Sequence, residues 1–260
     1  MRPLAGRRVL VTRPRAQSAG LCDRLRALGA TPVVFPTIEI EAPANPAALD
    51  AAIKAAADYD WIVFTSVNGV EAFWDAVQRE ERAGQTRQGP KFGTKIAAIG
   101  PATARALAER GVTAIVPAEY VAEALAAALG EVSGQRILLP RAEVTRDVLA
   151  FELRRRGAIV DEVAAYRTRL AMPDAAAVAE LRRGVDVVTF TSSSTVRSYM
   201  ALLHRLGLPP FDPRPLTVCI GPITSATARE AGLTMDATAA VYTVEGLLEA
   251  VKTLFAWEVT

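Results

Sequence analysis

Short clusters of hydroxyl-bearing residues, glycine and arginine follow the apolar runs of this chain. A hydroxyl at the start of a helix accepts a backbone N–H bond, and the remaining N–H groups there favour an anion. Arginine adds a planar fork of donors that matches a carboxylate. Together these residue types predict binding rims for a polyanionic ligand. The clusters are Thr12-Arg13-Pro14-Arg15, Thr65-Ser66-Val67-Asn68-Gly69, Gly100-Pro101-Ala102-Thr103, Pro140-Arg141, Thr191-Ser192-Ser193-Ser194 and Gly221-Pro222-Ile223-Thr224.

Each cluster also has a purely structural interpretation. A serine or threonine after a strand is as typical of a helix cap as of a ligand contact. Gly100 and Gly221 are also typical of a tight turn. Arg13 and Arg141 favour ligand contact more strongly, because an arginine at the end of a strand recurs in both halves of the chain.

The residues of most standard catalytic sites are missing from the sequence. His204 is the only histidine, so we expect neither a histidine-based triad nor a zinc site. Cys22 and Cys219 are too few for a disulfide framework or a metal cluster, and we expect them in the core. The fingerprints of phosphate-binding and dinucleotide-binding loops are absent. An enzyme of this type would work through hydroxyls, backbone amides and shape, with no metal and no cofactor.

Composition narrows the class of protein further. The 260 residues are enough for two domains, and 51% of them are hydrophobic, which allows a core in each. A net charge of +2 argues against a dedicated nucleic-acid binder. Arginines interrupt the start of the chain, and no apolar stretch is long enough to span a bilayer. We therefore expect a cytoplasmic protein with no nucleic-acid or membrane partner.

The elements that must position the clusters are short apolar strands that alternate with helices. Near-continuous apolar strands predict a parallel sheet covered on both faces, which is a doubly wound α/β fold. Glycines at positions 29, 111, 157 and 232 predict the ends of four helices. Val144, Val148 and Phe151 have the spacing of one buried helix face. The strands are expected at 9–11, 32–35, 61–64, 95–99, 113–116, 137–139, 159–160, 185–190 and 217–220.

The two halves of the chain repeat the same motifs in the same order. Arg8-Val9-Leu10-Val11-Thr12-Arg13 corresponds to Arg136-Ile137-Leu138-Leu139-Pro140-Arg141, 128 residues later. A Phe-Thr-Ser motif at Phe64 returns after 126 residues, and an Ile-Gly-Pro motif at Ile99 returns after 121 residues. A repeat of half the chain length predicts two similar domains that arose by internal duplication.

These motifs resemble the uroporphyrinogen-III synthase family over essentially the whole chain. The resemblance rests on Val9 to Pro14, Trp61 to Val70, Ile99 to Ala104, Tyr166-Arg167-Thr168, Phe190-Thr191-Ser192 and Ile220-Gly221-Pro222. It implies one discontinuous α/β domain of residues 1–35 and 172–260, and a second of residues 42–162. Segments 36–41 and 163–171 would cross between them as a two-stranded β-ladder linker.

The resemblance also implies a reaction. The substrate would be hydroxymethylbilane, a linear tetrapyrrole with eight carboxylates, which loses water and closes into a ring with its last pyrrole inverted. Unaided closure gives the uninverted isomer, so the enzyme would act by positioning and preorganised electrostatics. The implied protein is a monomeric lyase without a cofactor, with possible transient contact with hydroxymethylbilane synthase as its partner.

The family's functional residues map onto specific positions. Tyr166 matches a tyrosine that assists departure of the hydroxyl, although an aromatic packed at a hinge explains it equally well. Thr103 and Thr224 match threonines near the substrate, but Ile223 and Ser225 depart from the usual pattern around the second. The expected substrate-binding residues are Arg13, Ser66, Asn68, Gly69, Gly100, Thr103, Arg141, Thr191, Ser192, Ser193, Gly221 and Thr224.

Two other classes of function remain open at this point. A two-lobed small-molecule binding or sensor protein would use the same rims without turnover. A nucleotide-using enzyme of doubly wound type is disfavoured because the phosphate-binding fingerprints are missing.

Overall fold

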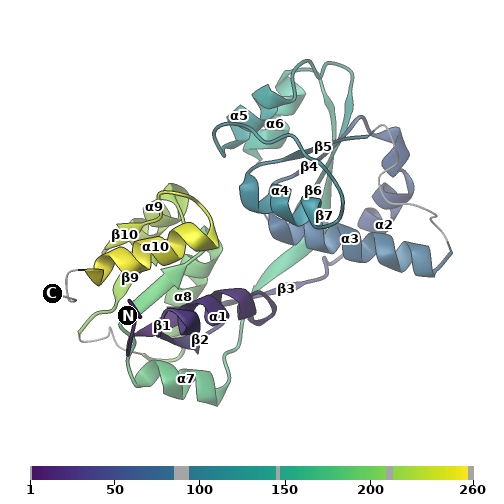
Figure 1. Cartoon of the computed structure of the whole chain (residues 1–260). Helices are drawn as coiled ribbons and strands as arrows, with labels where there is room; N and C mark the ends of the chain where they lie inside the picture. The colour runs from purple at the N-terminus through teal and green to yellow at the C-terminus, as the bar shows by residue number, and fades with distance from the viewer. Residues whose placement is uncertain (1, 85–93, 145–146, 209–212, 257–260) are drawn as a thin grey trace. The chain divides into compact units, whose positions relative to one another are not determined.

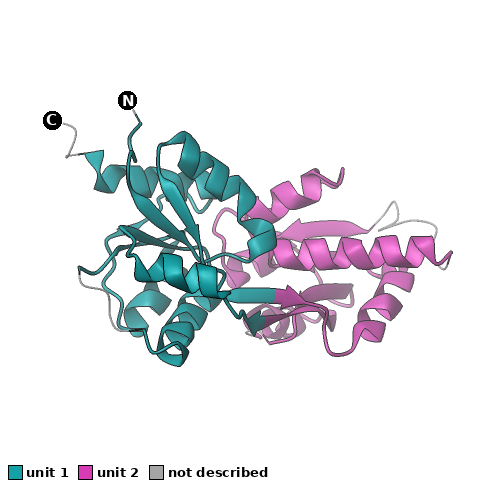
Figure 2. Cartoon of the chain, turned by 90° about the horizontal axis from the view of Figure 1, so that it is seen from below, with its two compact units in different colours: residues 1–39, 169–260 teal, residues 40–168 magenta. Residues whose placement is uncertain are grey.

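The computed structural model describes residues 2–84, 94–144, 147–208 and 213–256. The chain divides into two compact units (Figure 2). Unit 1 comprises Met1–Glu39 and Arg169–Thr260, and unit 2 comprises Ile40–Thr168. The chain therefore starts in unit 1, builds unit 2 and returns to complete unit 1.

Unit 1 contains a five-stranded sheet in the order β10-β9-β8-β1-β2, in which every adjacent pair is parallel. Helices α1 and α10 pack on one face of this sheet, and α7, α8 and α9 pack on the other (Figure 1). The elements are β1 (Arg8–Val11), a 3-10 turn (Arg15–Gln17), α1 (Ala19–Ala27), β2 (Thr31–Val34), α7 (Ala175–Arg182), β8 (Val187–Phe190), α8 (Ser193–Arg205), β9 (Leu216–Cys219), α9 (Pro222–Glu230), β10 (Ala237–Thr238) and α10 (Val244–Leu254).

Unit 2 contains a five-stranded sheet in the order β3-β7-β6-β4-β5. Helices α2, α3 and α4 cover one face, and α5 and α6 cover the other. The elements are β3 (Ile38–Glu41), α2 (Pro46–Lys54), a 3-10 turn (Ala56–Asp58), β4 (Trp61–Phe64), α3 (Val67–Arg82), β5 (Lys95–Ala98), α4 (Pro101–Ala108), α5 (Ala122–Ala128), β6 (Arg136–Ala142), α6 (Val148–Arg155) and β7 (Ile159–Leu170).

The two sheets have equivalent strand orders. In unit 1, β9, β8, β1 and β2 are neighbours in that order, and β5, β4, β6 and β7 repeat it in unit 2. Even the edge strand β10 has a counterpart, because Ala97 and Ile115 form a single parallel bridge beside β5. The predicted doubly wound fold and the internal duplication are confirmed.

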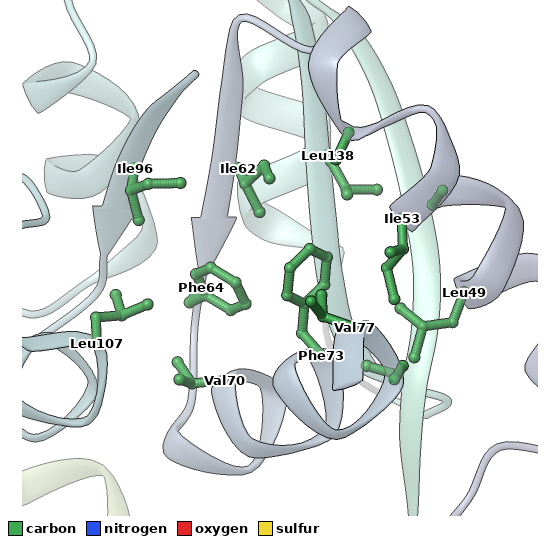
Figure 3. Packing of buried hydrophobic residues seen from close by; sticks show 14 of the residues in the cluster. Leu49, Ile53, Ile62, Phe64, Val70, Phe73, Val77, Ile96, Leu107 and Leu138 are labelled. Carbon is green, nitrogen blue, oxygen red and sulfur yellow. The ribbon is translucent and has the colours of Figure 1, made fainter. Parts of the chain in front are cut away.

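The core of unit 2 explains why its central strand β4 is apolar at every position. All four residues of β4 are buried. On one face Phe64 packs edge-on against Phe73 of α3, with ring centroids 5.5 Å apart (Figure 3). On the other face Trp61 and Val63 pack among residues of α5 and α6. A strand buried on both faces needs apolar residues at every position. The continuous apolar sequence of β4 fits this requirement.

Two predicted elements differ from the structure. The strand expected at 113–116 is reduced to the single bridge at Ile115. Val144, Val148 and Phe151 are exposed, whereas Leu149, Ala150 and Leu153 form the buried face of α6. The segments 36–41 and 163–171, which the resemblance implies as a crossing ladder, contain β3 and the end of β7. These two strands are hydrogen-bonded neighbours in the unit 2 sheet, and β7 also pairs with β6 from Ile159 to Tyr166.

Candidate active site

Each sheet contains two neighbouring strands whose following connections run toward opposite edges of the sheet. In unit 1 these strands are β1 and β8, and in unit 2 they are β6 and β4. In doubly wound sheets, ligands bind outside the carboxyl ends of such strands. The residues at or just after the carboxyl ends of the strands form one edge of each sheet. We call this set of residues rim 1 in unit 1 and rim 2 in unit 2.

Rim 2 brings Tyr166 together with two predicted residues that are distant from it in sequence. Ser66 follows β4, Asn68 lies in the first turn of α3, and Tyr166 lies on β7 opposite Ala142 of β6. The Tyr166 hydroxyl lies 3.1 Å from Ser66 Oγ, and it also hydrogen-bonds with Asn68. Ser66 Oγ accepts the backbone N–H of Gly69 at 3.0 Å, so the same hydroxyl caps α3. The cap and the tyrosine contact therefore coexist in one residue.

Burial keeps the pKa of Tyr166 above its ordinary value. Its side chain packs in the unit 2 core, and the residue is 7% exposed. This burial raises the pKa of the Tyr166 hydroxyl, and the hydrogen bonds with Ser66 and Asn68 oppose part of the rise. The hydroxyl is therefore protonated at neutral pH, so its O–H can donate a hydrogen bond.

Gly69 has a packing role at the start of α3. A Cβ added there would lie 3.0 Å from the carbonyl oxygen of Pro140 and 3.3 Å from Ser66 Oγ. The glycine thus lets α3 begin close to β6, which keeps Ser66 near Tyr166.

Rim 1 repeats the capping hydroxyl but has no tyrosine at the equivalent place. Ser192 Oγ accepts the backbone N–H of Thr195 at 3.3 Å and lies 2.9 Å from Ser194 Oγ. Thr37 instead joins the segment after β1 to the start of α8, because its hydroxyl donates to the carbonyls of Thr12 and Thr195. The two rims therefore differ chemically, and only rim 2 carries a tyrosine hydroxyl beside the capping serine among the described residues.

Other predicted residues of rim 1 have different neighbours. Thr191 is partly exposed between β8 and the cap. Ser193 Oγ lies 2.8 Å from Thr227 Oγ1, a contact that joins α8 to α9. Its hydroxyl is thus already engaged in helix packing.

The two predicted arginines lie in different environments. Arg13 follows β1 and is partly exposed. Arg141 is 14% exposed and forms ion pairs with Asp147 and Glu162. It lies inside β6, which extends beyond its pairing with β4 at Leu138, and not after the strand as predicted. Its charge is largely balanced by its neighbours.

The Gly-Pro turns, Gly100-Pro101 and Gly221-Pro222, open α4 and α9 without a side-chain cap. Both glycines have extended backbones, with φ of −164° and −174°, which any residue adopts. The interpretation that they serve a tight turn by conformational freedom is therefore wrong. Thr103 and Thr224 lie in the first turns of these helices and are 4% and 5% exposed.

Sequence reasoning missed the residues that occupy the space beside these glycines. A Cβ added at Gly100 would lie 3.4 Å from Tyr120 Cγ, and one added at Gly221 would lie 3.3 Å from Tyr242 Cγ. The signal was present, because Tyr-x-x-Glu-x-Leu begins at both tyrosines, 122 residues apart.

Three further features of the described residues concern metal ions, membranes and pockets. No group of three or more His, Cys, Asp or Glu within them could hold a metal ion. Nor is any helix in the described ranges both long and apolar enough to cross a membrane. An apolar pocket of about 420 Å³ in unit 1 is lined by Tyr199, Leu203 and His204, among others, and by none of the predicted site residues.

Comparison with known proteins gives one consistent result. Residues 20–249 match the family model described as uroporphyrinogen-III synthase HemD. The chain is 38% identical over 259 residues to the uroporphyrinogen-III synthase of Synechococcus elongatus, covering 96% of both chains. It is also similar to two solved structures. The first is a mutant uroporphyrinogen III synthase from Thermus thermophilus, with a TM-score of 0.64, 23% identity and coverage of 97% and 100% of the two chains. The second is uroporphyrinogen-III synthetase from Helicobacter pylori, with a TM-score of 0.59, 15% identity and coverage of 95% and 99%. These two likenesses show the fold.

Proposed function

The chain belongs to the uroporphyrinogen-III synthase family, and from this premise we propose that it closes hydroxymethylbilane into a ring while inverting the last pyrrole. The observation that carries this proposal is the family match over residues 20–249 together with 38% identity to a synthase of the same length. Membership makes the protein a lyase of tetrapyrrole biosynthesis. No observation favours a binding or sensor protein, or a nucleotide-using enzyme.

The reaction requires control of geometry. Loss of the terminal hydroxyl leaves an azafulvene cation, and attack at the substituted carbon of the last ring gives a spiro intermediate that fragments and recloses. The alternative attack at the unsubstituted carbon gives the uninverted product without help. An enzyme that favours the first route has to hold the two ends of the substrate in one arrangement.

We assign rim 2 the departure of the hydroxyl. Tyr166 is protonated, and its hydroxyl is oriented by Ser66 at 3.1 Å and by Asn68. A fixed O–H donor stabilises the leaving oxygen as it gains negative charge. The carboxylates of the substrate contact the other expected residues of both rims. Arg13 binds them through its guanidinium, and the N-termini of α4 and α9, which have no side-chain cap, bind them through backbone N–H groups.

A time course with freshly prepared hydroxymethylbilane tests the function. The expected product is the type III isomer, formed faster than the type I isomer appears in a blank without protein. Thermal stabilisation of the protein by hydroxymethylbilane without any turnover would instead identify a binding protein.

We also propose that the enzyme acts as a cytoplasmic monomer and receives its substrate in transient contact with hydroxymethylbilane synthase. The support is chemical, because substrate that closes unaided is lost to the wrong isomer. Sedimentation of the purified chain checks the monomer. In a coupled assay, an unrelated protein in excess should not change the ratio of type III to type I, whereas an inactive variant of this enzyme should lower it by competing for the contact.

A further inference from the structure

Two half-exposed tyrosines occupy equivalent positions in the two units. Tyr120 is 37% exposed and Tyr242 is 39% exposed. Each is followed closely by a helix, α5 in unit 2 and α10 in unit 1, and each begins a Tyr-x-x-Glu-x-Leu repeat. The separation of 122 residues between them is almost that between Gly100 and Gly221, which is 121.

Each tyrosine ring lies against a Gly-Pro turn at a carboxyl edge. Gly100 comes two residues after β5, and Gly221 comes two residues after β9. The contacts with the position of an added Cβ are 3.4 Å for Tyr120 and 3.3 Å for Tyr242. Because neither glycine has a positive φ, the space taken by the ring explains the glycine in both units.

This packing makes each ring a supported aromatic surface. The turn limits the freedom of the side chain, while more than a third of each residue stays exposed to solvent. An aromatic ring held in this way loses little conformational entropy when a flat ligand packs on it. Exposed apolar side chains adjoin both rings in sequence, Val121 beside Tyr120 and Val241 beside Tyr242.

We propose that Tyr120 and Tyr242 are substrate-positioning residues, each of which packs its ring against a pyrrole ring of the linear tetrapyrrole. This rests on the proposed function. Pyrroles are flat and electron-rich, so they pack on aromatic surfaces in offset or edge-on geometry. The cation formed when the hydroxyl leaves gains further from a tyrosine face. The arginine and helix N-termini of the rims then serve the carboxylates, and the two rings serve the pyrroles.

The test compares ring and hydroxyl at both positions. Tyr120→Ala and Tyr242→Ala should each raise KM about tenfold and increase the type I share of the product. Tyr120→Phe and Tyr242→Phe should retain wild-type KM, because the ring carries the contact. Phe151→Ala is the matched control, since Phe151 is an exposed aromatic on α6 outside both rims, and it should leave KM unchanged.

A second measurement separates substrate contact from folding. Gly221→Ala should raise KM by displacing the Tyr242 ring. In a Tyr242→Ala background it should add nothing, so the Gly221→Ala/Tyr242→Ala double variant should have the KM of Tyr242→Ala alone. Thermal unfolding of all variants shows which remain folded. Folded alanine variants with wild-type KM and wild-type isomer ratio would overturn the proposal, as would phenylalanine variants as impaired as the alanine ones. Wild-type protein that yields no type III isomer would instead overturn the proposed function itself.

Discussion

The Tyr166 hydroxyl is held by contacts that a packing role alone would not require. Its ring belongs to the unit 2 core, yet its oxygen contacts Ser66 and Asn68 at the start of α3. Ser66 meanwhile caps that helix. One residue thus joins the core of the unit to the helix start at the carboxyl edge.

Tyr166→Phe is expected to lower kcat by about 100-fold or more while KM changes little, because the lost O–H stabilises only the leaving oxygen. Steady-state kinetics with fresh substrate measures this. The unfolding free energy should fall by only about 1 kcal/mol for the lost hydrogen bonds.

A matched variant controls for burial. Tyr199 is also buried, packs against Phe190 in unit 1 and has a pKa raised by burial. Tyr199→Phe should keep the wild-type kcat. If Tyr166→Phe and Tyr199→Phe have equal kcat values, the Tyr166 hydroxyl has no catalytic role and the residue serves only in packing.

The two arginines should respond differently to removal. Arg13→Ala is expected to raise KM about tenfold through a lost carboxylate contact, with a smaller ratio at high salt. Arg141→Ala should raise KM less, because Asp147 and Glu162 already balance its charge. KM measured at two salt concentrations checks both, and an unchanged KM for Arg13→Ala would place that residue outside the substrate contacts.

At the scale of the element, the start of α3 depends on a missing side chain. Gly69→Ala should lower the unfolding free energy by about 1–3 kcal/mol, because its Cβ would crowd the Pro140 carbonyl and Ser66. Gly20→Ala in α1 is the control, since nothing lies within 4 Å of its added Cβ, and it should stabilise by about 0.4–1 kcal/mol. Denaturant unfolding measures both, and equal stability of the two variants would contradict this account of Gly69.

The elements themselves were largely predictable because their signals are local. Glycine readily adopts the positive φ that often follows a helix, so it predicts a helix end. The four glycines used in this way all have positive φ, namely Gly29, Gly111, Gly157 and Gly232. The α6 face was not predictable from spacing, because Val148 and Phe151 compete with Leu149 and Leu153 for burial on the same helix. The sheet accepts only one of these faces, and packing decides which.

Contacts within the site were harder to predict than its elements. The capping roles of Ser66 and Ser192 follow from their place between a strand and a helix. The contact between Ser66 and Tyr166 joins residues 100 positions apart, and only the pairing of β7 with β6 brings them together. The reason for Gly100 and Gly221 likewise depends on tyrosine rings some 20 residues further along.

At the scale of the whole molecule, duplication explains the pattern of similarity and difference. The two sheets share their strand order, and both carry a capping serine, a Gly-Pro turn and a supported tyrosine. They differ where Tyr166 of unit 2 has no tyrosine counterpart, since the position 128 residues earlier is Ile38. Under the proposed function, the repeated scaffold binds a repetitive substrate and unit 2 alone carries the tyrosine assigned to the departure of the hydroxyl.

The isomer composition of the product tests this account most directly. Purified protein is treated with a chelator, dialysed and mixed with fresh hydroxymethylbilane, and the oxidised porphyrins are separated by chromatography. The account predicts that type III predominates, and that Tyr166→Phe shifts the mixture toward type I. Type I alone from the wild-type protein, formed at the rate of the blank, would contradict it.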